Sequence, residues 1–256
     1  MITAAYLDKN IKATNIRELT EPLRAVSYIS TDTVDDEYLI PINAECTVVH
    51  GVLRGMDRVV KQSIKQGVPW MCMDNGYLGK YKRVILNATA PTTFRQGRRF
   101  NHGMQLQPWR GGQGSSILVL PPSPPYMDTF GLRDFLNFIA HNVNIYTDKN
   151  IIVRGKPAKG RKARPIEEQL NNAYCVITWG SAVALEAMRM GIPTISLGWC
   201  PAKMASKTIE ELETSDMLDE PDRMAVYDNL TWSSFERNEL SEAWDIAMEN
   251  SECRQI

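Results

Sequence analysis

The segment 174–198, YCVITWGSAVALEAMRMGIPTISLG, has the residue types of a phosphate-binding turn between a strand and a helix. Gly180 allows a sharp turn where the strand ends, and Ser181 can accept a hydrogen bond from a backbone N–H near residues 183–184. The remaining N–H groups and the helix dipole favour an anion. Glu186, about one and a half turns into the helix, could reach a ribose hydroxyl. The alternative is an ordinary capped helix with Glu186 facing solvent.

Further polar residues follow two other predicted strands at the same edge of a sheet, where open α/β folds bind ligands. Ser123 lies in the sequence PPSPP after strand 117–120, and Arg154 and Lys156 follow strand 151–153. A guanidinium can hold phosphate with two hydrogen bonds, and a lysine can neutralise it. For the rest of this basic segment, Lys159–Arg164, a solvated loop is the favoured interpretation.

Two residues of the first half could remove a proton from an acceptor hydroxyl. Asp74 follows strand 69–73 in a DNGY turn, and His50 ends strand 46–50. We expect Asp74 to be the base and His50 the second candidate. Asp-Asn-Gly is also a common plain turn sequence, so a purely structural role for Asp74 stays open.

Residues 89–116 break the regular pattern, with frequent glycine, proline and basic residues. Arginines alternate there with aromatic rings, which suits nucleic acid or another anionic polymer. The candidate acceptor-binding residues are Arg95, Arg98, Arg99 and His102. A connector without a ligand is the alternative, and the glycine-rich end, 111–116, is interpreted as a linker.

The rest of the chain alternates short apolar runs with helical segments, which is typical of an α/β fold with parallel strands. Strands are predicted at 25–30, 46–50, 69–73, 83–88, 117–120, 151–153, 174–178 and 193–197, and helices at 52–66, 131–143, 165–173, 182–190, 207–214, 221–229 and 234–249. The pattern predicts two Rossmann-like domains facing across a crevice: an N-terminal domain of residues 1–116 and a C-terminal domain of 117–230. The last helix, in 231–256, is expected to pack back toward the first domain.

Composition excludes several classes of protein. The 256 residues are 43% hydrophobic and 23% charged, which is ordinary globular usage, and no apolar run approaches a membrane span. The chain has five cysteines, no C-x-x-C motif and three histidines. This usage disfavours both a disulfide framework and a metal centre, so no metal is expected. The N-terminus lacks a signal-peptide pattern, so the cytoplasm is the expected location.

Charge is distributed unevenly along the chain. Residues 1–172 hold 23 lysines and arginines against 15 acidic residues, whereas residues 173–256 hold 6 against 15. This balance disfavours a dedicated nucleic-acid domain but permits one basic face that receives an anionic ligand. No G-x-G-x-x-G follows a strand and no P-loop motif is present, which disfavours an oxidoreductase and excludes a P-loop ATPase.

The segment 174–198 resembles the nucleotide-binding half of GT-B glycosyltransferases and the related UDP-sugar 2-epimerases. The matching residues are Gly180, Ser181, Glu186, Ala187, Gly191, Ile192 and Pro193. The resemblance implies a metal-independent glycosyltransferase that uses a nucleotide-sugar, with UDP-sugar the expected donor and no bound cofactor. It implies that Ser181 and its neighbours face the diphosphate and Glu186 the ribose. The proline-rich PPSPP departs from the glycine-rich loop that better-matched families carry.

The compact halves and the run WMCMDNGYLGKYKRVILNA also resemble bacteriophage glycosyltransferases. Such enzymes often modify hydroxymethylated pyrimidines in DNA, which is therefore the favoured acceptor. A surface polysaccharide or small-molecule acceptor is the alternative, as is a non-catalytic nucleotide- or nucleic-acid-binding module. The expected partners are a nucleotide-sugar and modified DNA, with no membrane, in a monomer or small homo-oligomer.

Overall fold

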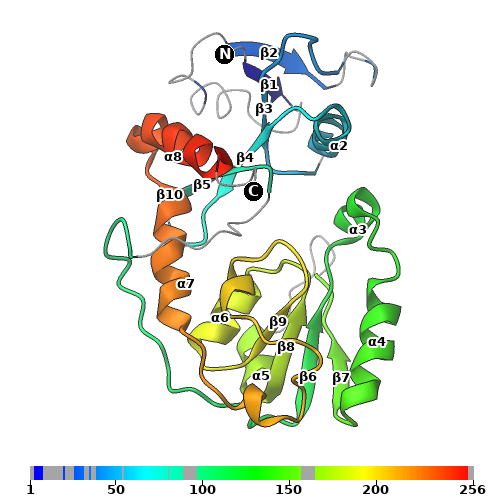
Figure 1. The fold of residues 1–256 in the computed structure, drawn as a ribbon. Coiled ribbons are helices and arrows are strands. Elements are labelled where there is room, and N and C mark those ends of the chain that lie inside the picture. Colours follow the sequence, from blue (N-terminus) through cyan, green and yellow to red (C-terminus); the bar gives the residue numbers. More distant parts are fainter. Residues whose placement is uncertain are drawn as a thin grey trace. The chain divides into compact units, whose positions relative to one another are not determined.

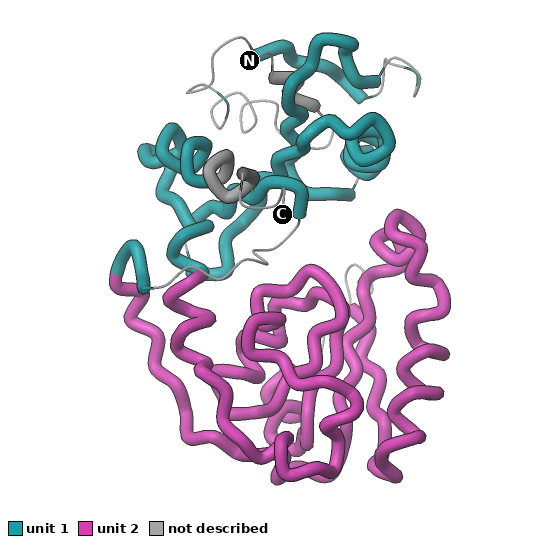
Figure 2. The backbone as a smooth tube through the Cα atoms, in the orientation of Figure 1, with its two compact units in different colours: residues 1–100, 230–256 teal, residues 101–229 magenta. Residues whose placement is uncertain are grey.

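The computed structural model describes residues 3–7, 20, 26–31, 35, 39–53, 55–79, 81–88, 97–156 and 165–252. The chain divides into two compact units (Figure 2). Unit 1 consists of residues 1–100 and 230–256, and unit 2 of residues 101–229. Unit 1 is therefore built from both ends of the chain, and unit 2 is one continuous segment.

Unit 1 contains a six-stranded sheet. Its elements are β1 (Thr3–Leu7), β2 (Val26–Ser30), β3 (Cys46–His50), α2 (Met56–Gln66), β4 (Trp70–Asn75), β5 (Lys82–Leu86), β10 (Ser234–Phe235) and α8 (Leu240–Glu252). The strand order is β10-β5-β4-β3-β1-β2. Strands β2, β1, β3 and β4 run parallel, while β5 and β10 are antiparallel to their neighbours. The short turn between β4 and β5 explains the reversal, because a parallel connection needs a crossover of a dozen or more residues.

Both faces of the unit 1 sheet are covered. On one face, α2 lies against β3 and β4 and buries Met56, Val59 and Val60. Helix α2 ends at Gly67, whose φ of 68° is the left-handed conformation that stops a helix, as the sequence predicts. On the other face, Phe235 and residues of α8 pack against alternate residues of β3, β4 and β5. The C-terminal segment thus completes the core of unit 1.

Unit 2 contains a four-stranded parallel sheet (Figure 1). Its elements are β6 (Ser116–Leu120), α3 (Pro124–Phe130), α4 (Phe135–Tyr146), β7 (Asn150–Val153), α5 (Ile166–Asn171), β8 (Ala173–Thr178), α6 (Val183–Arg189), β9 (Thr194–Ser196) and α7 (Arg223–Leu230), with 3-10 turns at Pro201–Ala205 and Ser215–Met217. The strand order is β7-β6-β8-β9. All strands that the sequence predicts are present in the two units.

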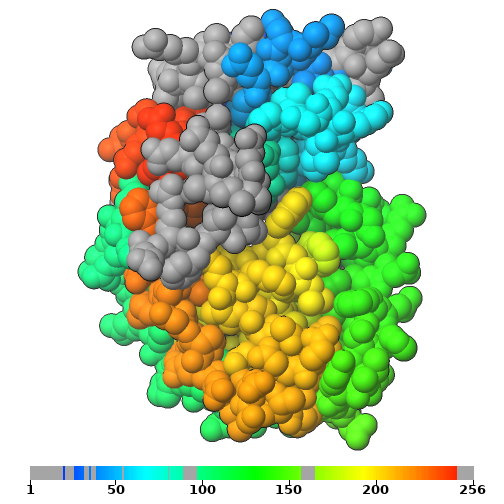
Figure 3. All heavy atoms as spheres, in the orientation of Figure 1, coloured from blue at the N-terminus to red at the C-terminus, as the bar shows by residue number. Residues whose placement is uncertain are grey.

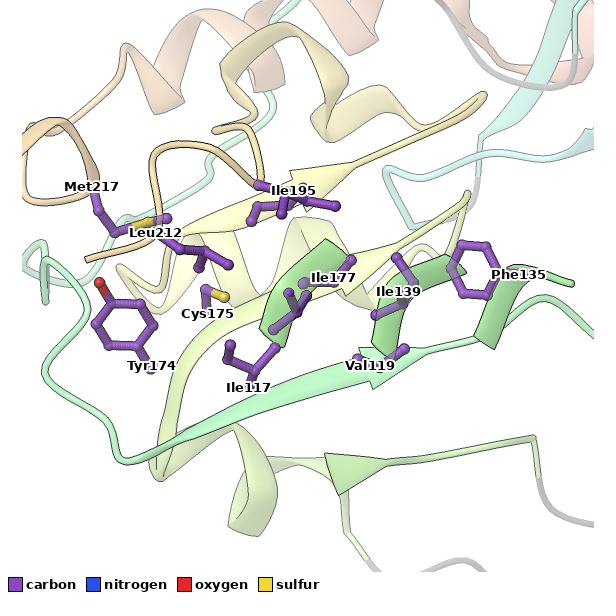
Figure 4. Packing of buried hydrophobic residues seen from close by; sticks show 12 residues of the cluster. Ile117, Val119, Phe135, Ile139, Tyr174, Cys175, Ile177, Ile195, Leu212 and Met217 are labelled. Atoms are coloured by element: carbon purple, nitrogen blue, oxygen red, sulfur yellow. The ribbon is translucent and has the colours of Figure 1, made fainter. Parts of the chain in front are cut away.

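Opposite faces of the unit 2 sheet bury alternate strand residues. Ile117, Val119 and Ile177 pack on one side with α4 and with Leu212 and Met217 (Figure 4). Leu118, Leu120 and Val176 pack on the other side with residues of α5 and α6. A sheet covered on both faces explains why these strands read as continuous apolar runs in the sequence.

The two units share one topology although no sequence repeat is visible. In chain order, the parallel strands of unit 1 are arranged second, first, third, fourth, and those of unit 2 follow the same arrangement. This confirms the predicted α/β class with two Rossmann-like units. In such sheets the second strand lies on one side of the first and the later strands lie on the other side. Ligands bind outside the carboxyl ends of the strands at this topological switch point. The switch points lie between β1 and β3 in unit 1 and between β6 and β8 in unit 2.

The boundary between the units lies between Phe100 and Asn101, whereas the sequence places it at 116. The physical reason is a series of backbone hydrogen bonds from 101–115 into unit 2. Gln107 N donates to Arg189 O at 2.8 Å, Arg110 N to Gly191 O at 2.8 Å and Ser115 N to Asn172 O at 3.1 Å. The glycine-rich end of this segment is packed as well, since a Cβ on Gly114 would lie 2.1 Å from the carbonyl carbon of Ala173.

Two local expectations fail. Residues 207–214 form turns rather than a helix, and Glu213 has a φ of 61°, which a regular helix does not tolerate. Figure 3 shows the segment after α6, in gold and orange, covering a large part of one face of unit 2.

In the proline-rich stretch after β6, a short helix, α3, replaces the predicted loop, since proline is compatible with the first turn of a helix.

Candidate functional site

Thr178, the last residue of β8, lies at the switch point of unit 2. Its buried hydroxyl donates to the carbonyl of Leu120, the last residue of β6, at 2.8 Å. The same oxygen accepts the backbone N–H of Ser181 at 3.2 Å. The ends of β6 and β8 and the turn after β8 are therefore joined through one side chain.

The turn after β8 has the hydrogen bonds that the sequence predicts for Ser181. Its Oγ accepts from Val183 N at 3.2 Å, and its carbonyl accepts from Ala184 N at 3.1 Å. Gly180 must lack a side chain, since a Cβ there would lie 2.7 Å from the carbonyl oxygen of Trp199. The backbone N–H groups of Gly180 and Ala182 have no acceptor within the described residues. Both residues are exposed, so the turn offers two donors at the switch point.

Glu186 lies on α6 and forms an ion pair with Arg189. Arg189 Nε donates to Glu186 Oε2 at 3.0 Å, and Nη2 donates to Oε1. These hydrogen bonds from Arg189 lower the pKa of Glu186, so its carboxylate is ionised at neutral pH. A carboxylate has about four acceptor positions, so two remain for other donors. The predicted contact of Glu186 with a ribose stays a prediction.

Ser123 and Arg154 also lie at the carboxyl ends of strands, but with different surroundings. Ser123 is half-buried directly before α3, and its side chain makes no capping hydrogen bond. Arg154 Nη1 donates to Gln169 Oε1 at 2.6 Å and to Pro165 O at 3.4 Å. The guanidinium of Arg154 is thus held by the start of α5, whereas Lys156 is exposed.

In unit 1, His50 and Asp74 lie at the carboxyl ends of neighbouring parallel strands. His50 ends β3 beside the switch point, and its register partner on β4 is Met73, the residue before Asp74. A Cβ on Gly51 would lie 3.8 Å from Asp74 Oδ2, so the backbone after His50 closely approaches this carboxylate. The structure brings together the two residues that the sequence selects as candidate bases.

Their environments separate the two candidates. Asp74 Oδ2 accepts from Arg83 Nη2 at 2.7 Å and Oδ1 from Asn75 N at 2.7 Å, so both oxygens already have a donor. Burial lowers the pKa of His50; the nearby Asp74 opposes this shift and the cations Lys82 and Arg83 add to it. His50 is therefore neutral at neutral pH, which is the form that can accept a proton.

Two of the three candidate acceptor residues that the structure describes, Arg99 and His102, form hydrogen bonds inside the protein. Arg99 has only 11% of its side chain exposed and donates to Glu239 Oε1 at 2.9 Å and to Thr231 O at 3.2 Å. His102 has 2% of its side chain exposed; Nε2 lies 3.0 Å from Asp228 Oδ1, and Nδ1 accepts from Met104 N at 3.0 Å. Arg98 is exposed, and Arg95 lies outside the described residues.

Three features of unit 2 were not singled out from the sequence. Thr178 joins the strand ends, and Lys203, exposed, donates from Nζ to Ser196 O at the end of β9 at 2.8 Å. Trp179 and Trp199 flank the same turn and the loop after β9. The tryptophans adjoin glycines in the pairs Trp179-Gly180 and Gly198-Trp199, which is the sequence signal that marks these two turns.

Two kinds of feature are absent from the described part of the chain. No cluster of three or more histidine, cysteine, aspartate or glutamate side chains there could hold a metal ion. Likewise, none of the helices described is both long and apolar enough to cross a membrane.

Comparison with known proteins gives structural similarity only, since no family model and no curated protein matches the sequence. One similar structure is KpsC of Thermosulfurimonas dismutans, a beta Kdo 2,4 transferase: TM-score 0.44, 10% identity, 90% of each chain covered. Another is S. aureus MnaA in a co-structure with UDP: TM-score 0.30, 9% identity, 94% of each chain covered. At these scores neither similarity assigns an activity to this chain.

Proposed function

We propose that this protein is a glycosyltransferase that moves a sugar from a nucleotide-sugar, with a UDP-sugar the expected donor, to a hydroxyl acceptor. The observation that carries the proposal is the turn at Gly180 and Ser181. It lies at the switch point of a parallel sheet, and two of its backbone N–H groups have no acceptor within the described residues. Backbone donors at such a point suit the diphosphate of a nucleotide.

Unit 2 is the donor-binding unit in this proposal. The N–H groups of Gly180 and Ala182 hold the diphosphate, and the exposed cations Lys203 and Lys156 add positive charge as the diphosphate leaves. Glu186 accepts a ribose hydroxyl with the oxygen positions that Arg189 does not occupy. Arg154 is a weaker candidate than the sequence suggests, because α5 holds its guanidinium.

Unit 1 supplies the base. His50 is neutral at neutral pH and accepts the proton of the acceptor hydroxyl as its oxygen bonds to the sugar and the bond to the diphosphate breaks. Asp74, which is ion-paired with Arg83, raises the pKa of His50 and so stabilises the imidazolium that forms. The order of the two candidates is thus reversed from the sequence-based expectation.

The acceptor is proposed only as a hydroxyl group. The DNA acceptor suggested by the sequence gains no support from the described loop, since Arg99 and His102 are held by Glu239 and Asp228. It therefore enters the test as one acceptor among several, beside polysaccharides and small sugars.

The proposal is tested with purified protein and a panel of nucleotide-sugars. Release of the nucleoside diphosphate is measured, and acceptors are analysed by mass spectrometry for a hexose- or pentose-sized gain. DNA containing cytosine, 5-hydroxymethylcytosine or 5-hydroxymethyluracil is compared with polysaccharide and monosaccharide acceptors. We expect donor turnover with at least one nucleotide-sugar, and a mass gain on one acceptor class.

The matched variants are Ser181→Ala at the carboxyl end of β8 and Ser115→Ala at the amino end of β6, where the serine is exposed. Ser181→Ala should weaken donor binding and Ser115→Ala should not. If no nucleotide binds the wild-type protein, the donor site is wrong. If nucleotides bind but are never turned over, the protein is instead a nucleotide-binding module.

A further inference from the structure

Helix α4 of unit 2 exposes apolar side chains but contains no charged residue. Ten large apolar side chains of the described residues are exposed, and four of them belong to α4: Leu136, Phe138, Ile145 and Tyr146. The sequence of α4, FLNFIAHNVNIY, lacks aspartate, glutamate, lysine and arginine. Helix α2, by contrast, has four such residues in eleven. Exposed aromatic residues in a segment without charge are typical of the centre of a protein interface.

Core packing accounts for one face of α4 and leaves the neighbouring face open. Phe135, Ile139 and Val143 are buried in unit 2. Phe138 comes one residue before Ile139, so it is rotated by about 100° from this buried face. Phe138 and Ile145, two turns apart, share the rotated face, and their exposed fractions are 50% and 61%. Figure 1 shows α4 on the outside of unit 2.

The open face of α4 forms a regular stripe. Asp134, Phe138, His141 and Ile145 are spaced four, three and four residues apart, which is the spacing along the seam of two paired helices. His141 is exposed. Asn142 lies beside it and donates from Nδ2 to Phe138 O at 2.8 Å, so its Oδ1 remains as an acceptor. The stripe therefore has the pattern of one half of a helix pair.

We propose that this stripe binds the same stripe of a second copy of the chain, with the two α4 helices antiparallel. An antiparallel pair that places Phe138 opposite Ile145 of the second copy also places His141 opposite Asn142 of the second copy. The apolar side chains then pack on each other on both sides of the two-fold axis. An imidazole N–H can donate to the amide oxygen beside the axis.

Charge complementarity at the ends of α4 favours a second copy as the occupant. In the same register, Asp134 before the helix lies opposite Lys149 after it, at both ends of the pair. Asp134 is exposed and makes no capping hydrogen bond. Lys149 lies 3.1 Å from Glu213 and keeps 26% of its side chain exposed, so a second carboxylate can approach it. A lipid surface would instead favour lysines and arginines along the helix, and α4 has none.

The test is the mass of the wild-type chain in solution, measured by sedimentation equilibrium over micromolar concentrations. We expect a monomer–dimer equilibrium, whether or not the proposed function is correct. Ile145→Lys should raise the dissociation constant by about 100-fold or more, because the substitution occurs twice in the pair. Ile64→Lys on α2 is the matched control, since 56% of Ile64 is exposed, and it should leave the constant unchanged.

Three results would overturn the inference. The first is a wild type that stays monomeric, and the second is a dimer that Ile145→Lys leaves intact or weakens no more than Ile64→Lys does. The third is a monomer that binds anionic lipid vesicles and loses this binding in Ile145→Lys, which would assign the stripe to a lipid surface.

Cross-linking tests the register. Chains with Phe138→Cys are mixed with chains with Ile145→Cys and treated with a short bis-maleimide. Both carry Cys253→Ser, and the other four cysteines are buried. We expect a cross-linked dimer in the mixture and little in either variant alone, because each new cysteine faces the other position. Cross-linking of Phe138→Cys chains with one another, or none in the mixture, would contradict the antiparallel pair.

Discussion

At the level of single residues, the sequence identifies both candidate bases but does not show which of them accepts the proton. His50 and Asp74 could be selected because both end predicted strands of one sheet. Their roles could not be assigned, because the ion pair of Asp74 with Arg83 depends on the register of an antiparallel pair, β4 and β5. That pair satisfies the carboxylate and leaves the imidazole as the better proton acceptor.

His50→Gln should lower the rate of sugar transfer by about 10²–10⁴-fold, the usual effect of removing a general base. Asp74→Asn should lower it less, because it removes only the charge that supports the imidazolium. Both variants should bind the donor within a few-fold of the wild type, since neither lies in unit 2. A His50→Gln enzyme with near-normal turnover would show that His50 is not the base.

The pH dependence of the reaction provides an independent check on His50. Because burial lowers its pKa below the ordinary 6.5, kcat/KM should be constant near pH 7 and fall only on the acid side, below pH 6.5. Asp74 raises this pKa and Lys82 lowers it. Asp74→Asn should therefore move the acid limb to lower pH, and Lys82→Gln should move it to higher pH. Shifts of the same sign in both variants would contradict this arrangement.

The stability of the protein should show the same titration. Between the lowered pKa of His50 and 6.5, the unfolded state binds a proton that the folded state does not. The free energy of unfolding should therefore decrease as the pH falls through 6.5 and level off, as far as His50 is concerned, below its folded pKa. In His50→Gln this part of the decrease should be absent when urea unfolding is followed from pH 7.5 to 5.5.

At the scale of elements, strands were easier to predict than the segments that connect them. Buried parallel strands such as β8 read as apolar runs because both faces of the sheet are covered. The segment 101–115 has no periodicity, and its packing depends on hydrogen bonds to residues such as Arg189 and Gly191, far along the chain. Local sequence carries no signal for such contacts, so the sequence alone predicts a loop and a linker here.

Gly191, at the end of α6, tests how tightly that segment packs. A Cβ there would lie 2.0 Å from the carbonyl oxygen of Pro108, and the φ of 77° is left-handed. Gly191→Ala should therefore destabilise the protein by more than the roughly 1–2 kcal/mol that the left-handed conformation alone costs. Gly131→Ala is the matched control, because its φ of 69° is similar and nothing lies within 4 Å of its Cβ. Equal losses in urea unfolding would show that the segment does not pack against α6.

At the scale of the whole molecule, the division into units follows from contacts that the sequence order hides. Residues 230–256 complete the core of unit 1 through Phe235 and α8, although they lie at the other end of the chain. The sequence predicts a similar alternation of strands and helices in the two halves, but it does not predict their shared strand order. Both switch points, and therefore the candidate site, are defined by the order of the strands, which the sequence does not give.

Unit 2 should fold and bind nucleotide without unit 1, because it is one continuous segment with cores on both faces of its sheet. We expect a fragment of residues 101–229 to bind UDP within a few-fold of the full chain. A fragment of 117–229 should be less stable, since it lacks the hydrogen bonds of Gln107, Arg110 and Ser115. Equal thermal stability of the two fragments would place the boundary at 116 after all.

The proposed binding of a nucleoside diphosphate at the switch point of unit 2 is tested most directly by an NMR titration. UDP is added to ¹⁵N-labelled protein with assigned backbone resonances, and shifts are mapped along the chain. We predict the largest changes at the amides of Gly180 and Ala182, which have no acceptor within the described residues, with smaller changes at Ser123. Saturable binding that shifts other regions and leaves Gly180 and Ala182 unchanged would contradict the account.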